Sequence, residues 1–267
     1  MAHDTFTIMG VVNVTPDSFS DGGRHPDAEA AVAHGRALAA QGAALIDVGG
    51  ESTRPGAEPV GEQEELRRVL DVVGGLAAGG LAVSVDTSKA AVARRALEAG
   101  AVYVNDVTAF RQDAGMAGVV AAAGCRCCLM HMRGAPRTMQ EDPRYEDVVD
   151  DVKAFLLERA TGAVAAGVAE ERIEVDPGIG FGKTAAHNLQ LLRRLDEIVA
   201  LGFPVVLGTS RKAFLGTLTG RADPQERVAA TVATAVLGLQ AGARVFRVHD
   251  VAAVRDALVV AEAVLTA

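Results

Sequence analysis

The sequence predicts an α/β fold, a single (β/α)₈ TIM barrel whose first and second strand-to-helix loops are long and mobile. Short apolar segments alternate with Ala- and Leu-rich segments of helical spacing, a pattern typical of βαβ units and a parallel sheet. Several helical segments end in a glycine just before the next apolar segment, as at Gly42, Gly100 and Gly242. The length of 267 residues fits one such barrel, so we expect one domain over residues 1–267.

The first four strands are expected where short apolar runs close on a polar residue or a turn. Thr7–Asn13 is an apolar run that ends at an amide, and Leu45–Gly49 opens into a segment rich in glycine and hydroxyl groups. Ala82–Asp86 and Tyr103–Asp106 both end in a carboxylate. The second strand is therefore the only one of these four whose end carries no acid or amide.

The last four strands follow the same rule. Arg126–Met130 precedes a histidine, and Ile173–Asp176 ends in a carboxylate. Val205–Gly208 leads into Ser210-Arg211-Lys212, and Arg244–Arg247 leads into Val248-His249. Because the carboxyl ends of barrel strands build the active site, these endings predict an enzyme with one site at that end.

Two strand-to-helix connections are unusually long and rich in Gly, Pro, Ser and Asp. They run from Val14 to about Pro26 and from Gly50 to about Gly61, and a third long connection covers Arg133 to Glu146. Long loops in a compact domain are often functional lids, so we expect the first two to close over the site.

The composition excludes several classes of partner. A formal net charge of −8 gives no basic footprint, which argues against nucleic acid and against a membrane surface. We find no signal peptide and no long uncharged apolar stretch. Cys125, Cys127 and Cys128 indicate a buried strand rather than a zinc site, and unpaired thiols suit the cytoplasm.

Three acid or amide side chains at strand ends predict a binding site for an uncharged ring. Asp86, Asn105 and Asp176 end the third, fourth and sixth strands, and we expect no basic side chain near them. Carboxylates accept from ring N–H and amino groups, as a pterin or a purine would offer. The alternative is a polar network that only satisfies itself.

Cationic side chains gather after the last two strands. Lys212, Arg247 and His249, with Ser210 and the turn at Gly208, lie where barrels usually bind phosphate. The alternative for Lys212 and Arg247 is a surface salt bridge each.

A magnesium ligand is predicted at the end of the first strand. Asn13 could give one oxygen to Mg²⁺ held mainly by substrate phosphates, and Asp17 or Asp21 could add a carboxylate when the first loop closes. The alternative for both acids is loop capping.

The segment Pro177–Thr184 looks like a phosphate-binding P-loop but has proline where that motif needs glycine. We interpret it as a flexible turn after the sixth strand that brings Phe181 near the site.

A family resemblance rests on segments that span almost the whole chain. They are Met9–Gly23, Asp47–Gly56, Ser84–Ser88, Asn105–Asp106, Leu129–Met132, Asp176–Gly178, Ser210–Lys212 and Arg247–His249. In these segments the chain closely resembles the dihydropteroate synthase family of folate biosynthesis. The resemblance implies a homodimeric barrel that joins 4-aminobenzoate to 6-hydroxymethyl-7,8-dihydropterin diphosphate, releasing diphosphate with Mg²⁺.

The resemblance also implies roles, carried over by matching position. The pterin would be held by Asp86, Asn105, Met130, Asp176, Gly208 and Lys212; the diphosphate by Asn13, Thr53, Arg247 and His249, with Asn13 also on the metal. The 4-aminobenzoate pocket would comprise Phe19, Arg54, Pro55, Phe181 and Ala213, and the catalytic residues would be Asp86, Lys212, Asp17 and Asp21. Many family members have serine where this chain has Ala213, so that contact differs here.

Two rival functions share this fold. A pterin-binding methyltransferase domain would keep the acid and amide contacts but should lack the cationic site after the last strands. A non-catalytic paralogue would bind pterin without turnover. The presence of Ser210–Lys212, Arg247–His249 and both loop sequences favours the synthase.

Overall fold

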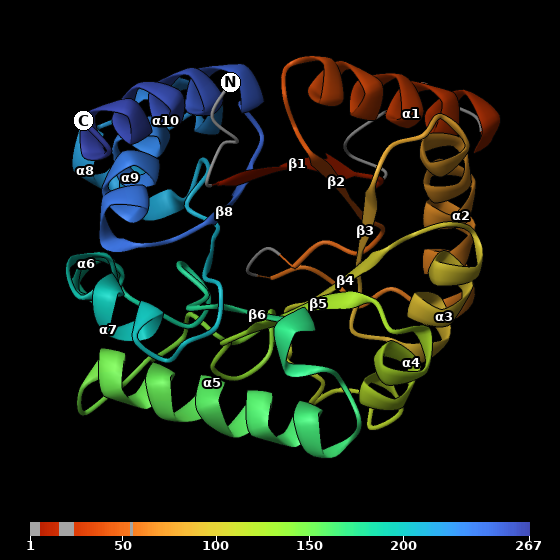
Figure 1. Cartoon of the computed structure of the whole chain (residues 1–267), viewed down its shortest axis with the longest axis horizontal. Coiled ribbons are helices and arrows are strands. Elements are labelled where there is room, and N and C mark those ends of the chain that lie inside the picture. The colour runs from red at the N-terminus through yellow and green to blue at the C-terminus, as the bar shows by residue number, and fades with distance from the viewer. Residues whose placement is uncertain (1–5, 16–23, 54–55) are drawn as a thin grey trace.

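The computed structural model describes residues 6–15, 24–53 and 56–267. Strands and helices alternate along the chain, and Figure 1 shows the strands at the centre with the helices around them. The strands are β1 Thr7–Asn13, β2 Leu45–Gly49, β3 Val83–Asp86, β4 Tyr103–Asp106, β5 Arg126–Met130, β6 Ile173–Asp176, β7 Val206–Leu207 and β8 Val245–Val248.

The helices form the outer layer. They are α1 Arg24–Ala40, α2 Glu62–Ala78, α3 Ala90–Glu98, α4 Met116–Ala123, α5 Val148–Ala165, α6 Ala185–Arg193, α7 Leu195–Val199, α8 Ala213–Thr219, α9 Val228–Ala241 and α10 Val251–Leu265, with short 3₁₀ turns at Glu170–Arg172 and Pro224–Arg227. None of the helices within the described ranges is long and apolar enough to cross a membrane.

The sheet is parallel and nearly closed, which confirms the predicted barrel. Its strand order is β6-β5-β4-β3-β2-β1-β8-β7. A single bridge between Val175 and Val205 joins the two edges, where the Val175 N–H donates to the Pro204 carbonyl at 3.0 Å. The strand ends therefore meet at one mouth, as the sequence predicted.

Strand boundaries differ slightly from the expected ones. β8 covers Val245–Val248 instead of Arg244–Arg247, and the Arg244 guanidinium donates to the Leu239 and Ala243 carbonyls of the preceding turn. β7 is reduced to Val206–Leu207, and β3 begins one residue late. None of these differences changes which residues reach the mouth.

Two apolar layers hold the barrel. Inside it lie Met9, Leu45, Tyr103, Cys128, Val206 and Val245, and a larger core fills the space between strands and helices. Strands buried on both faces read as continuous apolar runs, which is why the sequence marks them clearly. Cys127 and Cys128 lie buried in β5, which confirms the strand interpretation of that segment.

The glycines before the strands end helices as predicted. Gly42, Gly100 and Gly242 have φ values of 107°, 110° and 107°, a left-handed conformation that L side chains adopt only with strain. Each turn leads the chain from the helical layer back to the start of a barrel strand. The strands therefore run in the same direction and end at the same mouth.

Candidate active site

A pocket opens at the carboxyl ends of the strands. Most of the predicted site residues line it: Thr53, Asp86, Asn105, Met130, Asp176, Phe181, Gly208, Lys212 and Arg247, together with Val107, Gly178 and Ile179. Asp86 and Lys212 therefore face the same space, although β3 and β7 lie far apart in the sheet order. The structure brings the acid trio, Lys212 and Arg247 into one site.

A guanidinium lies between the carboxylates of two neighbouring strands. Arg247 donates through Nε to Asp47 Oδ2 and through Nη2 to Asp86 Oδ2, both at 2.7 Å. Its side chain keeps 24% exposure while Asp47 has none. The expectation that no basic side chain lies near the acids is wrong, because residues distant in sequence face each other across the barrel.

Burial makes Asp86 a weak acid. The pKa of its carboxyl is raised to about 7. Loss of water raises it most and Asp47 also raises it, whereas Arg247 acts to lower it. For Arg247, burial acts to lower the pKa, but Asp47 and Asp86 together raise it above its ordinary value. The guanidinium thus keeps its charge while the carboxylate titrates near neutrality.

Acceptor atoms are left facing the pocket after these bonds are made. The Asn105 amide donates to Asp47 Oδ2 at 3.3 Å, which turns its own oxygen away from that bond. Asp176 Oδ1 accepts the Gly178 N–H at 2.6 Å, and no described residue donates to its Oδ2. A ring rich in N–H donors would satisfy these oxygens.

Lys212 forms the opposite wall. Its Nζ lies 4.0 Å from the centre of the Phe181 ring, a cation–π contact. The pKa of Lys212 is lowered to about 8. Burial and the nearby Arg247 lower it, whereas Asp176 and Asp86 act to raise it. The ammonium is therefore less firmly charged than the guanidinium.

A strained residue lies between Ser210 and Lys212. Arg211 has φ 59°, which is unfavourable for an L residue. Two bonds to Asp250, at 2.6 and 2.9 Å, and the Arg211 N–H donated to Thr231 Oγ1 hold it there. The strain is stored between Ser210, which contacts His249, and Lys212, which lines the pocket.

His249 is held in place by Ser210. The Ser210 hydroxyl oxygen accepts the His249 backbone N–H at 3.1 Å and lies 3.0 Å from His249 Nδ1. A hydroxyl proton donated to Nδ1 would place the ring proton on Nε2. Burial, followed by Arg247 and Arg211, lowers the pKa of His249 to about 3, so the neutral ring offers an N–H donor.

The segment after β6 is a turn that brings Phe181 to the pocket, as interpreted from its sequence, and several hydrogen bonds hold it. Phe181 lines the pocket, and the Phe181 N–H donates to the Gly178 carbonyl at 3.0 Å. Lys183, the lysine of the apparent P-loop, is 3% exposed and points into the protein. It is therefore not a phosphate ligand of the P-loop kind.

The remaining predicted residues lie at the rim or outside the described ranges. Asn13 ends β1, and Ala213 is the exposed first residue of α8 directly after Lys212. Asp17, Phe19, Asp21, Arg54 and Pro55 fall outside the residues that the structure describes.

Sequence reasoning missed Asp47, Val107, Gly178 and Ile179. Asp47 gave a usable signal, since an acid in the middle of the apolar run of β2 is costly to bury without a partner. The three other residues contribute an apolar wall or backbone, for which the sequence pattern offers no chemical signal.

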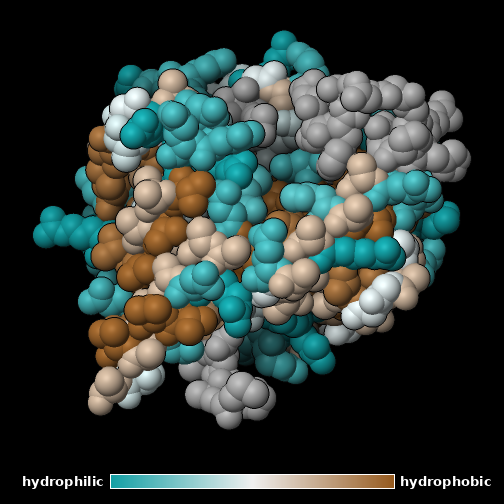
Figure 2. Space-filling model, turned by 90° about the horizontal axis from the view of Figure 1, so that it is seen from above, coloured by the Kyte–Doolittle hydropathy of each residue, from teal (hydrophilic) through white to brown (hydrophobic). Residues whose placement is uncertain are grey.

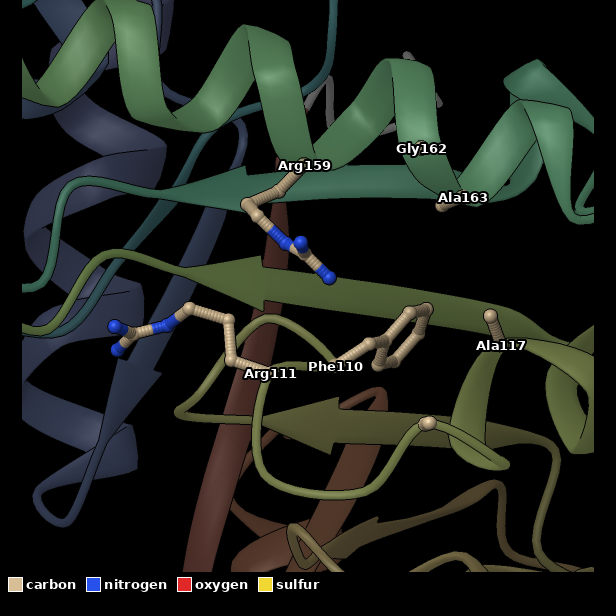
Figure 3. A pocket seen from close by; sticks show the side chains of 7 residues that line it. Phe110, Arg111, Ala117, Arg159, Gly162 and Ala163 are labelled. Atoms are coloured by element: carbon tan, nitrogen blue, oxygen red, sulfur yellow. The ribbon is translucent and has the colours of Figure 1, made fainter.

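A second cavity lies elsewhere. About 440 Å³ opens between α5 and the loop before α4, lined by Phe110, Arg111, Ala114, Ala117, Arg159, Gly162 and Ala163. Figure 3 shows the Arg111 guanidinium turned away from Phe110, where Nη2 donates to the Met132 carbonyl at 2.8 Å. Arg159 descends from α5 and donates to the Ala109 carbonyl, so both arginines brace loops.

Fold and site together define a class of protein. A barrel with carboxylate acceptors and anion-binding cations at one mouth is suited to binding a donor-rich ring that carries an anionic group.

Comparison with known proteins narrows this class. The sequence profile described as "Pterin binding enzyme" matches residues 9–249. The dihydropteroate synthase of Mycobacterium leprae is 51% identical over 97% of this chain and 94% of its own. Two solved structures of the Xanthomonas albilineans dihydropteroate synthase superpose closely: the 4-aminobenzoic acid complex (TM-score 0.92, 52% identity, 98% and 93% coverage) and the 7,8-dihydropteroate complex (0.89, 48%, 100% and 96%).

The chain therefore belongs to the pterin-binding enzymes, within the dihydropteroate synthase family, as the sequence resemblance indicated.

Proposed function

We propose that this chain is a transferase of folate synthesis that condenses 6-hydroxymethyl-7,8-dihydropterin diphosphate with 4-aminobenzoate to give 7,8-dihydropteroate and diphosphate. Full-length similarity to dihydropteroate synthases supports it, including one in complex with 7,8-dihydropteroate. The carrying observation in the site is that Arg247 lies against Asp86 in the same pocket as Lys212. Groups for a ring and groups for an anion thus face one substrate.

The acid and amide residues would hold the pterin. Asp86, Asn105 and Asp176 would accept the ring N–H and amino groups, with Met130, Gly208 and Lys212 around them. As the methylene carbon loses its diphosphate, positive charge spreads into the ring. Ionised Asp86 and Asp176 would stabilise that charge as fixed electrostatics.

The departing diphosphate would meet donors on β8. Two nitrogens of Arg247 are bound to carboxylates, and its Nη1 has no partner among the described residues. That N–H group and the Nε2–H of His249 would donate to diphosphate oxygens, with Thr53 at the second loop. The aromatic amine then forms the C–N bond as the C–O bond to diphosphate breaks, and the resulting anilinium loses one proton to the released diphosphate or to water, so no strong base is needed.

Magnesium fits the donor set at the rim. Asn13 offers one amide oxygen, a hard ligand suited to an ion that the diphosphate mostly holds, and Asp17 or Asp21 would add a carboxylate. When bound, the ion would neutralise charge on the leaving group.

A second copy of the chain is the proposed partner. Figure 2 shows hydrophobic side chains gathered on the left of the molecule, the side where α8, α9 and α10 lie in Figure 1. Exposed large hydrophobics on these helices are Leu218, Leu237, Val259, Val260, Val264 and Leu265. Apolar surface of this kind marks an interface, so we propose a homodimer. We also propose that the protein acts in the cytoplasm.

Diphosphate release that depends on 4-aminobenzoate tests the activity. The purified chain should release diphosphate from dihydropterin diphosphate only when 4-aminobenzoate and Mg²⁺ are present. A methyltransferase domain or a non-catalytic paralogue would release none. Light scattering of the wild type and of Val260→Glu would test the dimer, since the charged variant should dissociate.

A further inference from the structure

A buried lysine lies behind the pocket wall. Lys183 is 3% exposed, and no carboxylate of the described residues contacts it. Its Nζ lies 2.8 Å from His131 Nδ1, 3.0 Å from the Gly178 carbonyl, 3.1 Å from the Phe181 carbonyl and 3.5 Å from the His131 carbonyl. An ammonium buried without a carboxylate in direct contact is costly, so these four acceptors must offset much of that cost.

The acceptors belong to two different loops. His131 follows β5, whereas Gly178 and Phe181 belong to the turn after β6. The packing between them is tight, because a Cβ at Gly178 would lie 1.8 Å from the His131 carbonyl oxygen. Lys183 therefore joins the β6 turn to the end of β5 at a place where only glycine fits.

The same turn carries one wall of the substrate pocket. Phe181 places its ring against the Lys212 ammonium, and Gly178 and Ile179 also line the pocket. Lys183 bonds the backbone carbonyls of two of these three wall residues. A shift of the Lys183 Nζ would therefore move the Phe181 backbone, which carries the ring.

A second, weaker support holds the turn from outside. The exposed side chain of Gln140, in the loop after β5, donates to the Gly180 carbonyl at 2.6 Å. The turn is therefore held from within by Lys183 and from the surface by Gln140.

We propose that Lys183 is a positioning residue that fixes the Phe181 wall, and thereby the 4-aminobenzoate subsite, by bonding the Gly178 and Phe181 carbonyls and His131. The inference rests on the proposed function for the identity of the second substrate. It assigns Lys183 no contact with substrate. Burial, which lowers the pKa of Lys183 to about 7, agrees with a lysine held by neutral acceptors.

Steady-state kinetics with both substrates test the proposal. Lys183→Met removes the donors at similar length and should raise KM for 4-aminobenzoate by about tenfold or more, with KM for the pterin diphosphate within about twofold. Lys183→Gln keeps two donors and should lie between. A merely structural role would lower the amount of active protein and leave both KM values unchanged.

Gln140→Ala carries the test if the Lys183 variants do not fold. It removes only the surface support and should raise the same KM by about threefold. Gln112→Ala is the matched control, since Gln112 is an exposed glutamine at the same mouth whose side chain bonds no described residue. Equal changes in both KM values, or none in either variant, would overturn the proposal.

Hydrogen exchange separates this inference from the proposed function. The amides of residues 178–183 should exchange faster in Lys183→Met and in Gln140→Ala than in the wild type, whatever reaction the chain catalyses. A wild type that releases no diphosphate would refute the function alone. Unchanged exchange in both variants would refute the role of Lys183 alone.

Discussion

The two flanks of the pocket stabilise buried charge in different ways. On the flank built by β2, β3 and β8, Arg247 is bound to the carboxylates of Asp47 and Asp86. On the flank built by β6 and β7, Lys212 lies on an aromatic ring and Lys183 on carbonyls and an imidazole. Each flank buries cations, but only the first gives its cation opposite charges as direct partners.

The difference decides which groups titrate. Burial acts to lower the pKa of all three cations, yet Asp47 and Asp86 raise that of Arg247, whereas Lys212 falls to about 8 and Lys183 to about 7. Direct partners thus fix a charge, and neutral partners leave it responsive to pH. The flank with Arg247, here called the paired flank, suits an anion site that keeps its positive charge. The flank with Lys212 and Lys183, here called the lysine flank, suits a wall that loses its positive charge as the pH rises.

The largest expected effect comes from breaking the paired flank at the ring. Asp86→Asn keeps the shape but removes the charge that would stabilise the pterin cation, which should raise the barrier by about 3 kcal/mol, roughly 150-fold in turnover. The melting temperature should stay close to that of the wild type, because Asp47 still pairs with Arg247. The exposed Asp256→Asn is the control. Near wild-type turnover would remove Asp86 from the mechanism.

A change one layer deeper should affect folding more than chemistry. Asp47 Oδ2 accepts from both Arg247 and Asn105, and Asp47 is fully buried. Asp47→Asn weakens both bonds and should cost about 2 kcal/mol of unfolding free energy. Urea denaturation would measure it. A loss in Asp86→Asn equal to that in Asp47→Asn would contradict the ranking of the two carboxylates.

The sequence predicted the paired flank only in part. Asp86 and Arg247 were visible because each ends a strand, and a barrel brings strand ends together. Their contact was not, since 161 residues separate them and only closure of the sheet makes β8 face β3. Asp47 was missed because it lies within a strand and not at a strand end, where the site residues were expected.

The lysine flank was predicted by position but not by mechanism. The turn after β6 was expected to place Phe181 near the site, and it does. The burial of Lys183 depends on three glycines with positive φ, Gly178, Gly180 and Gly182, that fold the turn back on itself. Residue spacing alone does not reveal such a reversal, which is why the segment resembled a P-loop.

A pH titration would sharpen the comparison, because the affinity for a pterin should change about tenfold per pH unit. Asp86 must be ionised to accept the ring donors, and its pKa lies at about 7 in the folded chain, above its ordinary value of 3.8. Affinity for 6-hydroxymethylpterin should therefore be greatest between pH 7 and 8, where Lys212 is still protonated, and fall about tenfold for each unit below pH 7. Pterin fluorescence measures it. Over this range Arg247 stays charged, so a flat profile would place the titration elsewhere.

The smallest expected effect concerns the donor on β8. Ser210→Ala removes the hydroxyl that lies 3.0 Å from His249 Nδ1, so nothing at that atom would keep the ring proton on Nε2. Loss of one neutral bond should raise KM for the pterin diphosphate about fivefold, near 1 kcal/mol, with KM for 4-aminobenzoate unchanged. Thr217→Ala on the exposed face of α8 is the control. If His249→Ala weakens binding and Ser210→Ala does not, the tautomer does not depend on Ser210, and the anion site relies on Arg247 alone for its fixed geometry.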